Sequence, residues 1–127
     1  MNSKDKEIMN GFIKVRNLNK RTVYGYNNVI KLYTNFNNMS LSELLKEAEK
    51  DEEKGIRWKN RKIKMRLLNF RVFLQNNYLI STAKVHFQRI LTIYRHFEIE
   101  IHNLPQINLK NANKLKPIMF EDLPTKE

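Results

Sequence analysis

The sequence contains no cysteine among its 127 residues. This absence excludes a disulfide framework and any zinc site built on cysteine ligands. Long apolar runs are missing as well, the longest being three residues, such as Val72-Phe73-Leu74. A membrane-spanning helix needs roughly 20 predominantly apolar residues in succession, so the sequence predicts none. Residues 1–15 contain no apolar run of secretory length, and we therefore expect a cytoplasmic protein.

Glycine and proline are scarce, with three of each, and every proline lies at or beyond Pro105. The middle of the chain is thus free of the strongest helix breaker. The scattered glycines cannot form a glycine-rich phosphate loop. The length of 127 residues permits one domain with its own core. Together these features predict a single all-α domain.

Acidic residues are absent from one long segment. The chain has 24 Lys and Arg against 13 Asp and Glu, a net charge of +11. The segment from Lys54 to Phe97 has no acidic residue, whereas the remainder of the chain is neutral. A polyanion is the natural partner of such a chain, and nucleic acid is the first candidate. An anionic membrane surface would instead require an amphipathic helix whose apolar face is free to insert. The basic residues of the segment are Lys54, Arg57, Lys59, Arg61, Lys62, Lys64, Arg66, Arg71, Lys84, Arg89 and Arg95.

Apolar residues spaced by three or four predict four helices, of which the first two precede the basic segment. The first covers residues 20–36, with Asn19 as its N-cap. The second begins at Ser40, where Ser40 and Glu43 have the spacing of a capping box. We expect this second helix to be acidic on its outer face, which makes it a poor surface for phosphate.

The third and fourth predicted helices carry the basic segment. The third covers residues 58–76 and is expected to hold Arg57, Arg61, Lys64 and Arg71 on a mostly solvent-facing side. The fourth covers residues 81–97 and is expected to begin with Ser81 as its cap. The flanking segments differ in composition. Residues 1–18 are expected to form a partly disordered N-terminal arm, 19–104 the helical domain, and 105–127 a linker.

The basic faces of the third and fourth helices form the candidate DNA-binding surface. Lys and Arg neutralise backbone phosphates and release their counterions. The start of the fourth helix adds unpaired amides and two hydroxyls that suit a phosphate. Its polar stripe adds donors for base edges or phosphates in a major groove. The candidate contacts are Arg57, Lys59, Arg61, Lys64, Arg71, Ser81, Thr82, Lys84, Gln88, Arg89 and Arg95.

Residue types that carry catalysis or bind metals do not form a recognisable pattern. His86, His96 and His102 have no cysteine partners and no compact metal-ligand spacing, so we expect no metal and no cofactor. The acidic residues cluster on one helix, where paired catalytic carboxylates are hard to build. Trp58 lies beside a helix start, which favours a role as a core anchor over one in base stacking. No catalytic residue is predicted.

The last predicted helix reads Ser81-Thr82-Ala83-Lys84, followed by Ile90-Leu91-Thr92-Ile93-Tyr94-Arg95-His96-Phe97. This segment resembles the closing helix of the core-binding domain of tyrosine recombinases, the phage-integrase family. Gly55-Ile56-Arg57-Trp58 and Leu67-Leu68-Asn69-Phe70-Arg71 look like its third helix in the archaeal integrases. The resemblance begins near Leu18 and covers nearly all of the remaining chain. Its opening helix is represented by Lys20-Arg21-Thr22 with Tyr26, Ile30, Tyr33 and Phe36, and its linker by residues 120–127.

The resemblance implies a four-to-five-helix orthogonal bundle, often called SAM-like, that closes over one face of a DNA duplex. The catalytic domain of the same parent chain would close over the other face and cut the strand. This fragment would therefore be a monomer that is not itself an enzyme, whereas the parent would oligomerise on DNA. His86-Phe87-Gln88-Arg89 matches the family's H-x-x-R catalytic box. We interpret that match as a coincidence, because Phe87 lies on the apolar stripe and Tyr94 follows too soon.

Two other functions fit the same sequence. One is an independent DNA-binding regulator related to helix-turn-helix proteins, for which residues 76–81 would supply the turn. The other is a protein-interaction module that engages an acidic partner through the same basic face. Binding of duplex DNA is expected of the recombinase domain and of the regulator, but not of the protein-interaction module.

Overall fold

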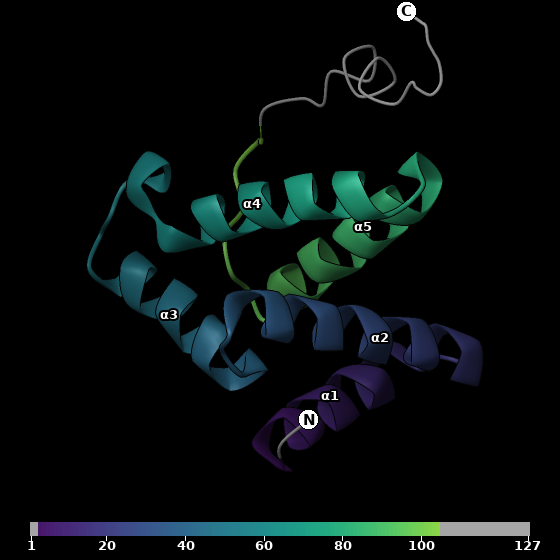
Figure 1. Ribbon diagram of the computed structural model, residues 1–127. Helices are drawn as coiled ribbons and strands as arrows, with labels where there is room; N and C mark the ends of the chain where they lie inside the picture. Colours follow the sequence, from purple (N-terminus) through teal and green to yellow (C-terminus); the bar gives the residue numbers. More distant parts are fainter. Residues whose placement is uncertain (1–2, 105–127) are drawn as a thin grey trace, which may run out of the picture.

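The computed structural model describes residues 3–104, which contain only helices and connecting turns, without a strand in that range (Figure 1). The prediction of an all-α bundle is confirmed. The predicted linker at 105–127 lies outside the described residues. The helices are α1 Ser3–Arg16, α2 Lys20–Asn37, α3 Leu41–Glu53, the 3-10 helix η1 Trp58–Asn60, α4 Lys62–Asn77 and α5 Ile80–His96.

Helix α5 lies between α4 and α2 and contacts both of them, while α3 contacts α4 and α1 (Figure 1). The ribbon shows α4 running in one direction and α5 returning after a tight turn, with α2 along the other side of α5 and α1 beneath α2. One core joins all five α-helices because each contributes fully buried apolar side chains. At its centre the rings of Tyr33 and Phe70 meet edge to face, with centroids 4.8 Å apart.

The helix starts predicted at Asn19 and Ser40 are both confirmed. Asn19 caps α2 by accepting a hydrogen bond from the Thr22 amide at 2.9 Å. Ser40 and Glu43 form the reciprocal capping box of α3, in which the Ser40 amide donates to Glu43 Oε1 at 2.9 Å. That hydrogen bond lowers the pKa of the Glu43 carboxyl. Side-chain caps therefore fix where these two helices begin.

The N-terminal segment differs from the prediction of a partly disordered arm over residues 1–18. Residues 3–16 form helix α1, whose Met9 and Phe12 are buried in the common core. Asp5 is only 3% exposed and its carboxylate accepts hydrogen bonds from the amides of Leu41 and Ser42, at 3.0 and 3.1 Å. Those amides begin α3 and have no partner within their own helix. An acidic side chain from α1 thus caps α3, and the domain begins before residue 19.

The start of α5 also differs from the prediction, because Ser81 is not its cap. The helix begins at Ile80 with Leu79 in the N-cap position, and no side chain caps it. The Tyr78 amide donates to the Leu74 carbonyl at 2.9 Å, and the Tyr78 ring packs edge to face against His86 at 5.2 Å. These contacts hold the short connection from α4 to α5. Ser81 lies exposed in its first turn.

Candidate nucleic-acid interface

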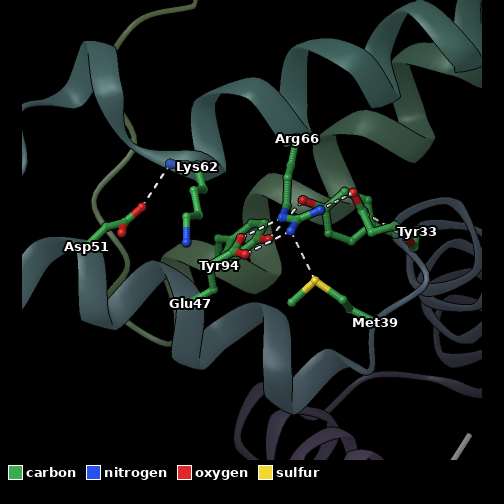
Figure 2. A network of polar contacts seen from close by, with 8 residues as sticks. Tyr33, Met39, Glu47, Asp51, Lys62, Arg66 and Tyr94 are labelled. Carbon is green, nitrogen blue, oxygen red and sulfur yellow. Dashed lines mark hydrogen bonds and ion pairs between the residues drawn. The ribbon is translucent and has the colours of Figure 1, made fainter.

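Helix α3 neutralises part of the basic segment that the sequence presents as acid-free. Glu47 on α3 accepts two hydrogen bonds from Arg66 on α4, one of them from Nη2 at 2.8 Å (Figure 2). This paired arrangement raises the pKa of the Arg66 guanidinium. Arg66 also donates from Nη1 to Asn37 Oδ1 at 3.0 Å, which adds α2 to the network. Arg66 therefore joins three helices and is not available to a ligand.

The acidic residues of α3 form a solvated outer face only in part: Glu43, Glu49 and Glu53 are exposed, whereas Glu47, Asp51 and Glu52 contact other segments. Asp51 is buried, and its Oδ2 accepts a hydrogen bond from the Lys62 amide at 2.8 Å (Figure 2). It therefore caps α4, where an anionic side chain at the helix start is favourable. Glu52 accepts a hydrogen bond from the Glu100 amide at 2.7 Å and holds the segment that follows α5. Three carboxylates of α3 thus stabilise the basic part of the chain.

Arg61 was predicted to contact DNA, but the structure gives it a different role. Its Nη1 donates to Glu100 Oε1 at 2.9 Å, and its Nε donates to the Ile56 carbonyl at 2.8 Å. Only 12% of the side chain is exposed, and Glu52 lies 3.8 Å from it. Hydrogen bonds from His102 and then from Arg61 lower the pKa of the Glu100 carboxyl. Arg61 therefore ties the segment around Glu100 to the start of α4. Its charge is already paired and is not available to a ligand.

Arg57, which precedes η1, and Lys59, which lies within it, are both exposed before α4 begins. Lys59 lies at a shallow hollow of about 460 Å³. Two of the cations around that hollow, Arg61 and Arg66, are paired with glutamates, which leaves Lys59 and Lys62 as its exposed charges. The predicted contacts Arg57 and Lys59 therefore lie at η1, apart from the predicted donors on α5. The hollow is lined by Asn37, Lys59, Asn60, Arg61, Lys62, Met65, Arg66 and Asn69.

Lys64 and Arg71 lie on the flank of α4 that faces α5. The Arg71 guanidinium sits 5.7 Å from the centroid of the Phe87 ring on α5, and burial lowers its pKa. Lys64 precedes Arg71 by seven residues and so lies on the same side, two turns away. Arg66 is displaced from Arg71 by about 140° around the helix, at roughly 100° per residue, and faces α3. Both predicted residues are half-buried and not mostly solvent-facing.

Helix α5 presents an outward stripe of donor residues beside that flank. Lys84, Gln88 and Arg95 are all exposed, and their spacing of four and seven residues places them along one side of the helix. Within residues 3–104, every ion pair involves Arg61, Arg66 or His102, so no carboxylate neutralises this stripe. We call Lys64, Arg71, Lys84, Gln88 and Arg95 the α4–α5 face.

The first turn of α5 adds two more predicted residues to one end of the α4–α5 face. Ser81 is exposed and Thr82 is half-buried. Because no side chain caps α5, its first amides remain available as donors. The amides and the two hydroxyls expected at the start of the helix are therefore present, although the helix begins at Ile80 and not at Ser81.

Arg89 lies on a different side of α5 from the outward stripe. Its guanidinium is 5.6 Å from the centroid of the Tyr26 ring, so the side chain points across to α2. It is half-buried. The structure therefore separates Arg89 from the α4–α5 face and assigns it to the contact between α2 and α5.

A second acid-free run went unnoticed in the sequence because its charge was averaged with the acidic residues around it. No Asp or Glu occurs between Ile8 and Ser42, a stretch that includes the whole of α2. None of its cations is ion-paired within the described part of the chain. The run therefore places unpaired cations on α1 and on α2, and α2 contacts α5. The cations of the run are Lys14, Arg16, Lys20, Arg21 and Lys31.

The described residues show no site of another kind. Within residues 3–104 no group of three His, Asp or Glu side chains could hold a metal ion. In the same range no helix is both long enough and apolar enough to cross a membrane. Trp58 packs against the core and stacks on His102, with ring centroids 5.1 Å apart, as a core anchor would.

No family model, curated protein or solved structure matches this chain. A function for it has to be inferred from its own residues and their arrangement.

Proposed function

We propose that this domain binds duplex DNA through the α4–α5 face. The observation that carries the proposal is the separation of charge within one bundle. The carboxylates of α3 pair with Arg61 and Arg66, whereas the cations of the α4–α5 face have no acidic partner in residues 3–104. A row of unpaired cations with an interleaved amide is the surface that phosphates and base edges require.

The geometry of α5 suits a major groove. Lys84 and Arg95 are eleven residues apart, which spans about 16 Å at 1.5 Å per residue. A helix of this kind fits the major groove of B-DNA, roughly 12 Å wide, with its flanking cations on the phosphates. Lys64 and Arg71 lie on one flank of α5, where one edge of the groove would pass. Gln88 in the middle of the stripe has the donor and acceptor needed for a base edge.

The finer part of the proposal concerns the parent chain. The resemblance to tyrosine recombinases would make this domain the half of a clamp that holds a recombination half-site. What supports it is that three of the segments that carry the resemblance fall on helices, namely on α2, α4 and α5, whereas Gly55-Ile56-Arg57-Trp58 lies in the turn and η1 before α4. In this proposal the domain cleaves nothing by itself, and strand cleavage belongs to a catalytic domain elsewhere in the parent chain. Tethering would raise the effective concentration of that domain at the bound site.

The test is a titration of the protein against a labelled duplex at two salt concentrations. With four or five phosphates contacted, the affinity should fall about 150- to 500-fold between roughly 50 and 200 mM salt, at a slope of about 0.9 per contact. Lys84→Ala should weaken binding at low salt and reduce that slope by about 0.9. The melting temperature of the Lys84→Ala variant should equal that of the wild type, because the Lys84 side chain is exposed and has no partner in the described residues.

Lys46→Ala is the matched control, since Lys46 is an exposed lysine on the acidic helix α3. The two variants lose the same charge, so equal losses of affinity would show that net charge alone drives binding. Absence of binding at low salt would contradict DNA binding outright. It would leave an acidic protein partner as the ligand of the α4–α5 face.

A further inference from the structure

Gly25 on α2 lies directly beneath the head group of Arg89 on α5. A methyl group at Gly25 would come within 2.3 Å of Arg89 Nη1, 2.5 Å of Cζ and 2.8 Å of Nη2. Real side chains do not approach so closely, so the guanidinium occupies the space that any other residue would fill. Glycine is unfavourable in a helix interior. Its presence at this point of α2 allows Arg89 to rest against the helix backbone.

The charge of Arg89 is held in place but not neutralised. Its guanidinium packs near the Tyr26 ring, and no carboxylate within residues 3–104 is paired with it. Burial, and then the positive charge of Arg89, lower the pKa of His86 one turn earlier on α5. A guanidinium that packs against a helix backbone and has no carboxylate partner can receive an anion, because its two-pronged edge matches a phosphate.

Helix α2 supplies a second cation beside this position. Arg21 precedes Gly25 by four residues, so it lies one turn away on the same edge of α2. It is exposed and, like Arg89, is not part of any ion pair in the described residues. The acid-free run from Ile8 to Ser42 leaves no carboxylate on α2 to compete with a ligand.

We propose that Arg89 and Arg21 form a phosphate-binding site at the contact between α2 and α5, and that Gly25 is the positioning residue of that site. The ligand is a backbone phosphate of duplex DNA, so the inference rests on the proposed function. It adds α2 to the DNA-contacting surface and gives Arg89 a task distinct from that of the outward stripe of α5.

Gly25→Ala tests the site without removing a charge. The new methyl group displaces the Arg89 head group, which is the far end of a flexible side chain and can swing into solvent. Binding to a labelled duplex at low salt should weaken roughly tenfold, as expected for one charge-assisted contact. Arg89→Ala should show a similar loss, and the double variant should bind no worse than Arg89→Ala alone. The salt slope should fall by about 0.9 in each case.

Gly11→Ala is the matched control, because nothing lies within 4 Å of a methyl group at Gly11 on α1. Both glycine variants should melt at or above the wild-type temperature, since alanine favours a helix. If Gly25→Ala unfolds the protein, Arg21→Ala remains as a variant that leaves the close contact untouched and should lower affinity by a similar factor. Duplex binding by the wild type with unchanged affinity in Gly25→Ala or Arg21→Ala would overturn the site alone. Absence of binding by the wild type would overturn the proposed function with it.

Discussion

The hydroxyl groups of Tyr33 and Tyr94 form a buried hydrogen bond of 2.8 Å that joins α2 to α5. The two side chains are 1% and 2% exposed, and no other hydrogen bond of either hydroxyl occurs within residues 3–104. Burial raises the pKa of both phenols, which therefore stay neutral in the folded protein. The pair links the two helices that carry the proposed phosphate-binding site.

Replacing one tyrosine by phenylalanine should destabilise the fold more than replacing both. Tyr94→Phe removes the hydrogen bond and leaves the Tyr33 hydroxyl buried without a partner, at a cost of about 2 kcal/mol. Tyr33→Phe should cost about the same for the same reason. The double variant removes both polar groups from the core and should lose less than about 1 kcal/mol, because no unsatisfied hydroxyl remains.

Urea unfolding of the wild type, the two single variants and the double variant measures this directly. The double-mutant cycle should give a coupling of about 3 kcal/mol, beyond the range expected for independent sites. Thermal melting should show the same order, with each single variant roughly 10 °C below the wild type and the double variant close to it. If the double variant loses as much as the two single variants together, the hydroxyls do not depend on each other and the reasoning fails.

Two further predictions concern stability. Phe12→Ala should lower the free energy of unfolding by about 3 to 5 kcal/mol, because the Phe12 ring is fully buried and lies 5.0 Å from Tyr26 and 4.9 Å from His96; an unchanged urea midpoint would show that α1 is not part of the core. Stability should also fall above about pH 10, by up to about 1.4 kcal/mol per pH unit for each buried phenol, because the unfolded chain loses phenol protons that the folded chain retains. Urea titrations at rising pH measure this slope, and a Tyr33→Phe/Tyr94→Phe variant with the same slope would contradict the assignment.

Local patterns were enough to predict four helices and two of their starts. Asn19 and Ser40 accept hydrogen bonds from amides three residues later, so the two partners of each cap lie close together in the sequence. The left-handed ends of helices at Asn17 and Asn38, with φ of 52° and 53°, fit the frequent asparagines but could not be placed in advance. The prediction of Ser81 as a cap was wrong because a hydroxyl near a helix start looks the same in a sequence whether or not it accepts the capping hydrogen bond.

Interactions between distant segments could not be predicted from a single sequence. Asp5 caps α3 from 36 residues away, and no spacing rule connects it with Leu41. Arg61 carries the same charge as Lys84, yet a glutamate 39 residues later removes it from the candidate surface. Gly25 is one of three glycines, and only the approach of Arg89 from another helix shows why it stands there. Each of these contacts depends on the packing of the bundle.

The folded arrangement changes where the free positive charge of this chain lies. In the sequence the longer acid-free segment begins at Lys54, so the start of α4 looks as basic as α5. Helix α3 removes that equivalence, because its carboxylates pair with Arg66 and approach Arg61. The shorter acid-free run brings unpaired cations to α2, on the other side of α5. A polyanion would therefore be attracted to α5 and its two neighbours, and α5 is the helix that should lie closest to the DNA.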